Sequence, residues 1–223
     1  MVFAVPTDQH STSGALHAVA SIYDLKPRFQ ALLRPITNSL AAKGVTANQV
    51  TIAASVISLA TGALVATWPE SRPILLLVPL VLFVRMALNA IDGMLAREHN
   101  MKSRRGAVLN ELGDVISDAA IYLPIALVPE VPAALVVVLV VLGIISEMAG
   151  VVAVQIGAER RYDGPLGKSD RAFAFGLIAF LLGCGVQPGA WLTWLLAVLI
   201  LMADITIIRR ARQARIFADQ SAN

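Results

Sequence analysis

The sequence predicts an all-α, polytopic membrane protein with six transmembrane helices and an N-terminal helix that lies in the membrane interface. Of its 223 residues, 57% are hydrophobic and only 15% are charged, whereas an ordinary soluble domain has about 25% charged residues. The mean hydropathy is +0.72. So few charges cannot cover a soluble protein of this size. The composition also excludes a disordered chain, a collagen-like fibre and a disulfide scaffold.

The N-terminal region precedes the first apolar run. Residues 1–24 are predicted to be a flexible cytosolic tail, because no basic stretch leads into an apolar core as in a signal peptide. Leu25–Leu40 mixes apolar residues with Lys26, Arg28 and Arg34, which favours an interfacial helix over an irregular basic tail. Thr46, followed three residues later by Gln49, predicts a capping box at the start of the first span.

The rest of the chain contains six apolar segments, and about 20 apolar residues span a bilayer as a helix. The predicted spans are Ala47–Thr67, Ile74–Arg97, Ala107–Val128, Ala133–Ile156, Ala172–Val186 and Ala190–Ile208. Proline-containing turns connect the first span to the second, the third to the fourth and the fifth to the sixth, at residues 68–73, 129–132 and 187–189. The membrane domain is therefore expected over residues 25–211, with a cytosolic tail over 212–223.

The basic residues predict the orientation, because Lys and Arg accumulate in cytoplasmic loops. Of the basic residues in the loops and tails, only Arg72 falls on the side opposite the cytoplasm. The cytoplasmic set is Lys26, Arg28, Arg34, Lys43, Lys102, Arg104, Arg105, Arg160, Arg161, Lys168, Arg171, Arg209, Arg210, Arg212 and Arg215. Both termini are thus expected on the cytoplasmic face of a bacterial inner membrane. Because these residues are spread over several loops and form no single basic face, no nucleic-acid partner is expected.

Six acidic residues lie inside or at the ends of the apolar runs. They are Asp92, Glu111, Asp114, Asp118, Glu147 and Asp204. A carboxylate at bilayer depth costs roughly 2.5–3.5 kcal/mol, so a functional role is the first interpretation. The single cysteine, Cys184, excludes an internal disulfide and a cysteine-based zinc site, and the scattered His10, His17 and His99 argue against a histidine metal cluster.

Polar residues form one stripe on each of the second and third spans. At 100° per residue, the first stripe falls within roughly a 60° arc and the second within roughly a 100° arc. The first stripe contains Arg85, Asn89, Asp92 and Ala96, and the second contains Asn110, Glu111, Asp114 and Asp118. The wet face of a soluble helix is the alternative, but the apolar flanks disfavour it. The short loop between the spans predicts that the stripes face each other. Oxygen-only ligands suit Mg²⁺ or Mn²⁺, which would neutralise a diphosphate.

These stripes resemble the signature of the CDP-alcohol phosphatidyltransferases, D-x2-D-G-x2-A-R-x8-G-x3-D-x3-D. Every spacing agrees, and the two departures are asparagines at the first and third aspartate positions. The segment reads Asn89-x2-Asp92-Gly93-x2-Ala96-Arg97-x8-Gly106-x3-Asn110-x3-Asp114. The resemblance extends to Gly44–Thr51, which looks like the family's entry into its first span, and to Gly167–Arg171, which looks like its loop before the fifth.

The resemblance implies an enzyme of phospholipid synthesis that moves a phosphatidyl group from CDP-diacylglycerol to an alcohol and releases CMP. It implies a binuclear Mg²⁺ or Mn²⁺ site held by four aspartates, a homodimer among membrane lipids, and a general base at Asp114. The metal role carries over to Asp92 and Asp114, and to Asn89 and Asn110 as an open question. The nucleotide role carries over to Asp92, Gly93, Ala96, Arg97 and Gly106.

The two asparagines leave three hypotheses open, because each removes a negative charge from a cation site. Glu111 and Asp118 could restore the lost carboxylates as metal ligands. Alternatively, the site holds one metal and uses another donor or acceptor. In the third hypothesis, the protein binds nucleotide or lipid without turnover. A carboxylate-lined transporter is a further class, disfavoured because Asp92 and Asp114 cluster at one leaflet and no internal repeat is evident.

The remaining charged residues each have two interpretations. Arg85 is expected to pair with a buried carboxylate such as Glu147 or Asp204, in preference to binding a phosphate. Four basic residues near the cavity mouth either anchor the protein to anionic lipid or hold a phosphate on the acceptor. They are Lys168, Arg171, Arg104 and Arg105. The acceptor is accordingly either a small alcohol or a phosphorylated alcohol.

Overall fold

The computed structural model describes residues 22–221, which form seven α-helices and one short 3₁₀ helix. In chain order they are α1 (Ile22–Ala42), α2 (Ala47–Thr67), α3 (Arg72–Glu98), α4 (Arg104–Tyr122), η1 (Leu123–Leu127), α5 (Ala133–Gln155), α6 (Lys168–Gly183) and α7 (Ala190–Ser221). The predicted all-α class is confirmed. Residues 1–21 of the tail predicted over residues 1–24 lie outside the described residues, and so do His10 and His17.

Local hydrogen bonds fix where the helices begin. The Gln49 amide N–H donates to Thr46 Oγ1 at 3.3 Å, and the Thr46 N–H donates to Gln49 Oε1 at 2.9 Å, which confirms the capping box. Ser103 Oγ accepts the Gly106 N–H at 2.9 Å and caps α4. The helix predicted around Leu25–Leu40 is also present, as α1.

The largest differences from the predicted bounds are at three boundaries. The third span was predicted to reach Val128, but α4 ends at Tyr122 and continues as η1, because Pro124 has no N–H for a further α-helical bond. Helix α6 begins at Lys168, four residues before the predicted start, because Asp170 Oδ2 accepts the Gly167 N–H at 2.8 Å and caps it. Helix α7 continues to Ser221, so residues 212–221 are helical.

Four of the described helices, α2, α3, α5 and α7, are long and apolar enough to cross a membrane. Helix α6 has only 16 residues, and α4 carries the polar stripe predicted for the third span. Length and composition therefore support an integral membrane protein. The count of six spans, which needs α4 and α6 to cross as well, stays a prediction.

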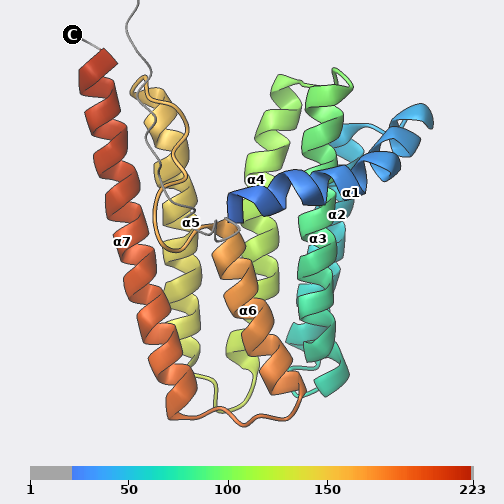
Figure 1. Ribbon diagram of the computed structural model, residues 1–223. Coiled ribbons are helices and arrows are strands. Elements are labelled where there is room, and N and C mark those ends of the chain that lie inside the picture. The colour runs from blue at the N-terminus through green and yellow to red at the C-terminus, as the bar shows by residue number, and fades with distance from the viewer. Residues whose placement is uncertain (1–21, 222–223) are drawn as a thin grey trace, which may run out of the picture.

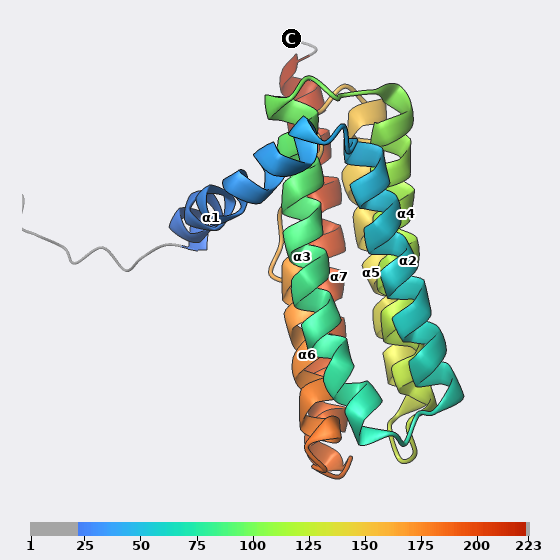
Figure 2. The same cartoon turned by 90° about the vertical axis from the view of Figure 1, so that its right-hand side faces the viewer.

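The helices form an elongated bundle (Figures 1 and 2). Helix α5 packs along α7, α2 lies between α3 and α4, and α6 packs on α3. Helix α1 lies across one end and slants away from the bundle, held to α3 by Leu33 in the apolar cluster with Met94 and by the ion pair of Arg34 with Glu98 at 2.9 Å. Helix α6 begins about halfway along the bundle, and its N-terminus faces the half that contains α1 and the α3–α4 turn.

The apolar core fills the half of the bundle occupied by α6. Buried side chains from α3, η1, α5, α6 and α7 meet there, and the rings of Tyr122 and Phe175 stack with centroids 4.1 Å apart. Gly62 lets α2 and α4 approach closely, because a Cβ at this position would overlap the carbonyl oxygen of Ala120. The close approach holds α4 against α2.

Gly62→Val is therefore expected to destabilise the protein by roughly 2 kcal/mol or more, since overpacking a tight contact costs about 1–3 kcal/mol and here the obstacle is backbone. Thermal unfolding of the detergent-purified protein measures the effect. Ala63→Leu, which adds bulk at the neighbouring exposed position, is the control and should leave the melting temperature nearly unchanged. Equal losses from both variants would contradict the contact.

Candidate functional site

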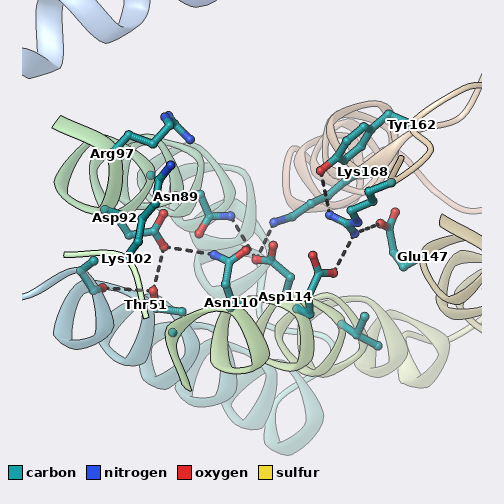
Figure 3. Close-up of a pocket in the computed structure, with 18 of the residues that line it drawn as sticks. Thr51, Asn89, Asp92, Arg97, Lys102, Asn110, Asp114, Glu147, Tyr162 and Lys168 are labelled. Carbon is teal, nitrogen blue, oxygen red and sulfur yellow. Dashed lines mark hydrogen bonds and ion pairs between the residues drawn. The ribbon is translucent and has the colours of Figure 1, made fainter. Parts of the chain in front are cut away.

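A polar cavity of about 850 Å³ lies in the half of the bundle beyond the N-terminus of α6 (Figure 3). Its walls come from α2, α3, α4 and α5, from the loop between α5 and α6, and from the first turn of α6. Both predicted polar stripes face this cavity: Asn89, Asp92 and Ala96 from α3, and Asn110, Glu111 and Asp114 from α4 line it. The predicted face-to-face arrangement of the two stripes is therefore present.

Asp92 is buried and receives two side-chain hydrogen bonds on one oxygen. Thr51 Oγ1, from α2, donates to Asp92 Oδ2 at 2.9 Å, and Asn110 Nδ2, from α4, donates to the same atom at 3.4 Å. The Thr51 contact was not anticipated from the sequence, although Thr51 closes the Gly44–Thr51 segment that carries part of the family resemblance. These contacts hold the Asp92 side chain of α3 against α2 and α4 (Figure 3).

Asp114 has a matching arrangement on the opposite helix. Asn89 Nδ2, from α3, donates to Asp114 Oδ1 at 3.2 Å, the Lys168 ammonium forms an ion pair with the same oxygen, and Arg85 Nη2 lies 3.6 Å from it. The pairing is therefore reciprocal: the asparagine of each helix donates to the aspartate of the other (Figure 3).

The two acids that could restore the lost carboxylates are held by arginines. Asp118 is buried and pairs with Arg85 and with Arg171, the latter at 3.5 Å. Glu111 lines the cavity but pairs with Arg160 at 2.7 Å. Metal binding by Glu111 and Asp118 stays a prediction, and their arginine partners compete with it.

Arg85 does pair with a buried carboxylate, as predicted, but the partner is Asp118 and neither Glu147 nor Asp204. Arg85 pairs with Asp118 and approaches Asp114, because the register between α3 and α4 places it opposite these residues. Glu147 is instead occupied by other arginines, and Asp204 is exposed on α7.

Glu147 is the centre of a buried ion network. Its carboxylate receives Arg171 Nη2 at 2.8 Å and Arg160 Nη2 at 3.1 Å, and lies 3.4 Å from Arg210 Nη1. With Asp118 and Arg85, the network connects α3, α4, α5, α6 and α7. Arg160 and Arg210 were assigned from the sequence only to the cytoplasmic loops. A glutamate inside an apolar run indicates that a cationic side chain pairs with it, but the sequence does not identify that side chain.

The residues predicted to hold the nucleotide all line the cavity. They are Asp92, Gly93, Ala96, Arg97 and Gly106. A Cβ at Gly106 would lie 2.6 Å from Asn48 Oδ1, so the Asn48 side chain would have to move. Two further residues of this wall, Asn48 and Lys102, were not singled out from the sequence.

The four basic residues predicted near the cavity mouth separate in the structure. Lys168 lines the cavity. Arg171 is buried and held by Glu147 and by Ser146 Oγ at 3.0 Å. Arg104 and Arg105 are exposed on the first turn of α4, outside the cavity lining. Their roles toward an acceptor stay predictions, and the geometry favours Lys168.

The donor set of the cavity fits one hard divalent cation better than two. In the described part of the chain, no group of three or more His, Cys, Asp or Glu side chains could hold a metal. Asp92, Asp114 and the amide oxygens of Asn89 and Asn110 provide oxygen ligands, which Mg²⁺ and Mn²⁺ prefer. The two carboxylates carry the charge that balances one such ion.

An apolar groove of about 500 Å³ runs between α3 and α6 and meets the polar cavity. Its walls include Phe83, Phe173 and Leu177. Lys168 and Asn89 line both spaces. A ligand with one polar and one apolar part could therefore occupy both, with its junction beside Lys168.

Replacing the centre of the ion network should unfold the bundle more easily. Glu147→Gln is expected to cost roughly 3–5 kcal/mol, because it leaves buried arginines without their counter-charge. Glu98→Gln, which breaks the exposed pair with Arg34, is the matched control and should change stability little. Thermal or denaturant unfolding in detergent compares the two, and a Glu147→Gln protein as stable as the control would contradict the role of the network.

Residues 44–205 match the family model described as CDP-alcohol phosphatidyltransferase. Inner membrane protein YnbA of Escherichia coli (strain K12) is 48% identical over 195 residues, which cover 86% of this chain and 95% of that protein. Archaetidylinositol phosphate synthase of Pyrococcus horikoshii is 34% identical over 103 residues, which cover 46% of this chain and 52% of that enzyme.

The fold also resembles solved structures of phosphatidylinositol phosphate synthase (PgsA1) from Mycobacterium tuberculosis. The structure with CDP-DAG bound superimposes with a TM-score of 0.68 at 22% identity, covering 81% of this chain and 92% of that one. The complex with manganese and citrate gives a TM-score of 0.67 at 23% identity, covering 81% and 87%. At these identities the likeness establishes a shared fold.

Proposed function

This chain belongs to the CDP-alcohol phosphatidyltransferase family, and we propose that it transfers a phosphatidyl group from CDP-diacylglycerol to the hydroxyl of an alcohol, releasing CMP. The observation that carries the proposal is the junction of the polar cavity, which contains the family motif, with an apolar groove at Lys168 and Asn89. The enzymes among its relatives are phospholipid synthases.

The two connected spaces support a CDP-linked lipid as the donor. Such a lipid has a polar nucleotide and two acyl chains joined through a diphosphate. The nucleotide would occupy the cavity beside Gly93, Ala96 and Gly106, and an acyl chain would follow the groove past Phe83 and Phe173. The diphosphate would then lie near Lys168. The M. tuberculosis neighbour solved with CDP-DAG bound supports this assignment.

Asp114 is proposed as the general base. It would accept the proton of the acceptor hydroxyl, directly or through one water, as that oxygen attacks the lipid-side phosphorus. The bond from this phosphorus to the oxygen of the cytidylate breaks, and CMP leaves with the electron pair. The contacts of Asp114 converge on Oδ1, which leaves Oδ2 for this proton. Arg97 and Lys102 line the cavity and would offset the charge of the nucleotide phosphates.

Mg²⁺ or Mn²⁺ is proposed as the cofactor, held by Asp92 and Asp114 with the amide oxygens of Asn89 and Asn110. When bound, the ion would neutralise charge on the diphosphate during transfer. The neighbour crystallised with manganese supports this choice. Lys168 is the best-placed of the predicted acceptor-binding residues, since it lines the cavity, and it could contact the phosphate of a phosphorylated alcohol.

One observation favours a second function, the binding of nucleotide or lipid without turnover. The proposed base, Asp114, is already paired with Lys168 and hydrogen-bonded by Asn89. Turnover therefore requires that Lys168 transfer its contact to substrate, and an activity measurement separates the two functions.

Purified protein supplied with CDP-diacylglycerol, Mg²⁺ or Mn²⁺ and a panel of neutral and phosphorylated alcohols is expected to release CMP. Asp114→Asn should lower the rate by about 100-fold or more, because a general base contributes 10²–10⁴-fold. Asp204→Asn is the matched control, since Asp204 is exposed and lies outside the cavity lining. Metal-dependent binding of CDP-diacylglycerol without CMP release, for every alcohol tested, would instead establish the binding function.

A further inference from the structure

We propose that this site holds a single divalent cation. A site with four aspartates needs a second cation for its positive charge, and here the Lys168 ammonium takes the place of that second cation. The inference rests on the proposed function, because it concerns the same cavity. It concerns the two positions, Asn89 and Asn110, at which this chain departs from the family signature.

The first step is the charge of the cavity floor, by which we mean the side chains of Asn89, Asp92, Asn110 and Asp114. Four aspartates carry four negative charges and balance two divalent cations, whereas Asp92 and Asp114 balance one. The other nearby acids do not make up the difference, because Asp118 is paired with two arginines and Glu111 with Arg160. The carboxylates at the motif positions are therefore those of Asp92 and Asp114, and Asp114 also has Lys168 on its Oδ1.

The second step is what the asparagines do in place of aspartates. Asn110 Nδ2 lies 3.4 Å from Asp92 Oδ2, and Asn89 Nδ2 lies 3.2 Å from Asp114 Oδ1. Carboxylates at these positions would bring like charges together at about these distances, which requires a cation between them. An amide instead donates a hydrogen bond and leaves its carbonyl oxygen as an acceptor. The asparagines thus stabilise the two remaining aspartates without a second ion.

The third step is the position of Lys168. Its ammonium pairs with Asp114 Oδ1, on the side of the carboxylate that Asn89 also contacts. It lies where the polar cavity meets the apolar groove, which is where the diphosphate of a CDP-lipid would lie. One divalent cation and one ammonium exceed the charge of two carboxylates by one unit. The site would thus keep a positive charge for an incoming diphosphate.

The position of Lys168 is fixed by the contacts that anchor α6 one turn further along the helix. Arg171 is buried and bonded to Glu147, Ser146 and the Leu166 carbonyl oxygen, and Asp170 caps the helix at Gly167. These contacts fix the first turn of α6, so the Lys168 side chain is held over Asp114 (Figure 3). An ordinary surface lysine has no such support.

Mn²⁺ binding to the purified protein without nucleotide tests the inference. Equilibrium dialysis is expected to find one Mn²⁺ per chain for the wild type and two for the Asn89→Asp/Asn110→Asp variant. Electron paramagnetic resonance then distinguishes an isolated ion from a coupled pair. Two ions, or none, on the wild-type chain would overturn the inference, and this result does not depend on how the double variant folds.

Lys168 variants test the second half. Lys168→Gln should bind Mn²⁺ at least about threefold more tightly, because a neighbouring positive charge has been removed, and should release CMP more slowly. Lys168→Arg keeps the charge and should restore both properties toward the wild type. A Lys168→Gln protein with unchanged Mn²⁺ affinity would contradict the role. If one Mn²⁺ binds but no alcohol supports CMP release, the proposed function fails while the inference stands.

Discussion

The buried ion network around Glu147 is the constraint on which the rest of the structure depends. Charges at this depth are costly unless they are paired and hydrogen-bonded. The network meets this cost by drawing Arg171, Arg160 and Arg210 onto one carboxylate and Arg85 onto Asp118. Because its members come from five helices, the relative positions of these helices are coupled. Apolar packing alone, between helices with lipid on their outer faces, is far less specific.

The network also positions the site. Arg171 lies one turn from Lys168 on α6, and its bonds to Ser146 and Glu147 fix where that helix begins. Because α6 is short and begins about halfway along the bundle, the polar cavity lies beyond its N-terminus. Arg160 reaches from the α5–α6 loop to Glu111 and Glu147 and forms one wall. Structural ion pairs and the proposed chemistry therefore share the same helix.

The exchange of two aspartates for asparagines is best understood as a change in how the cavity floor is neutralised. In this chain each aspartate is held by the asparagine of the facing helix, and Asp114 also by Lys168. A cavity that is largely neutralised by its own side chains needs less metal than one built from four carboxylates. The fold and the motif spacing are the same in both cases, so neither reveals the difference.

The sequence by itself determined the helical class, the start of α2 at its capping box, the facing stripes of α3 and α4, and the motif residues that line the cavity. These features depend on neighbours within a few residues or on a fixed motif spacing. The tertiary structure decided the partners of Arg85, Glu147 and Asp118, the contact of Thr51 with Asp92, and the placement of Lys168 over Asp114. Such pairs join residues on different helices, and their register is set by packing of the whole bundle, which no local pattern encodes.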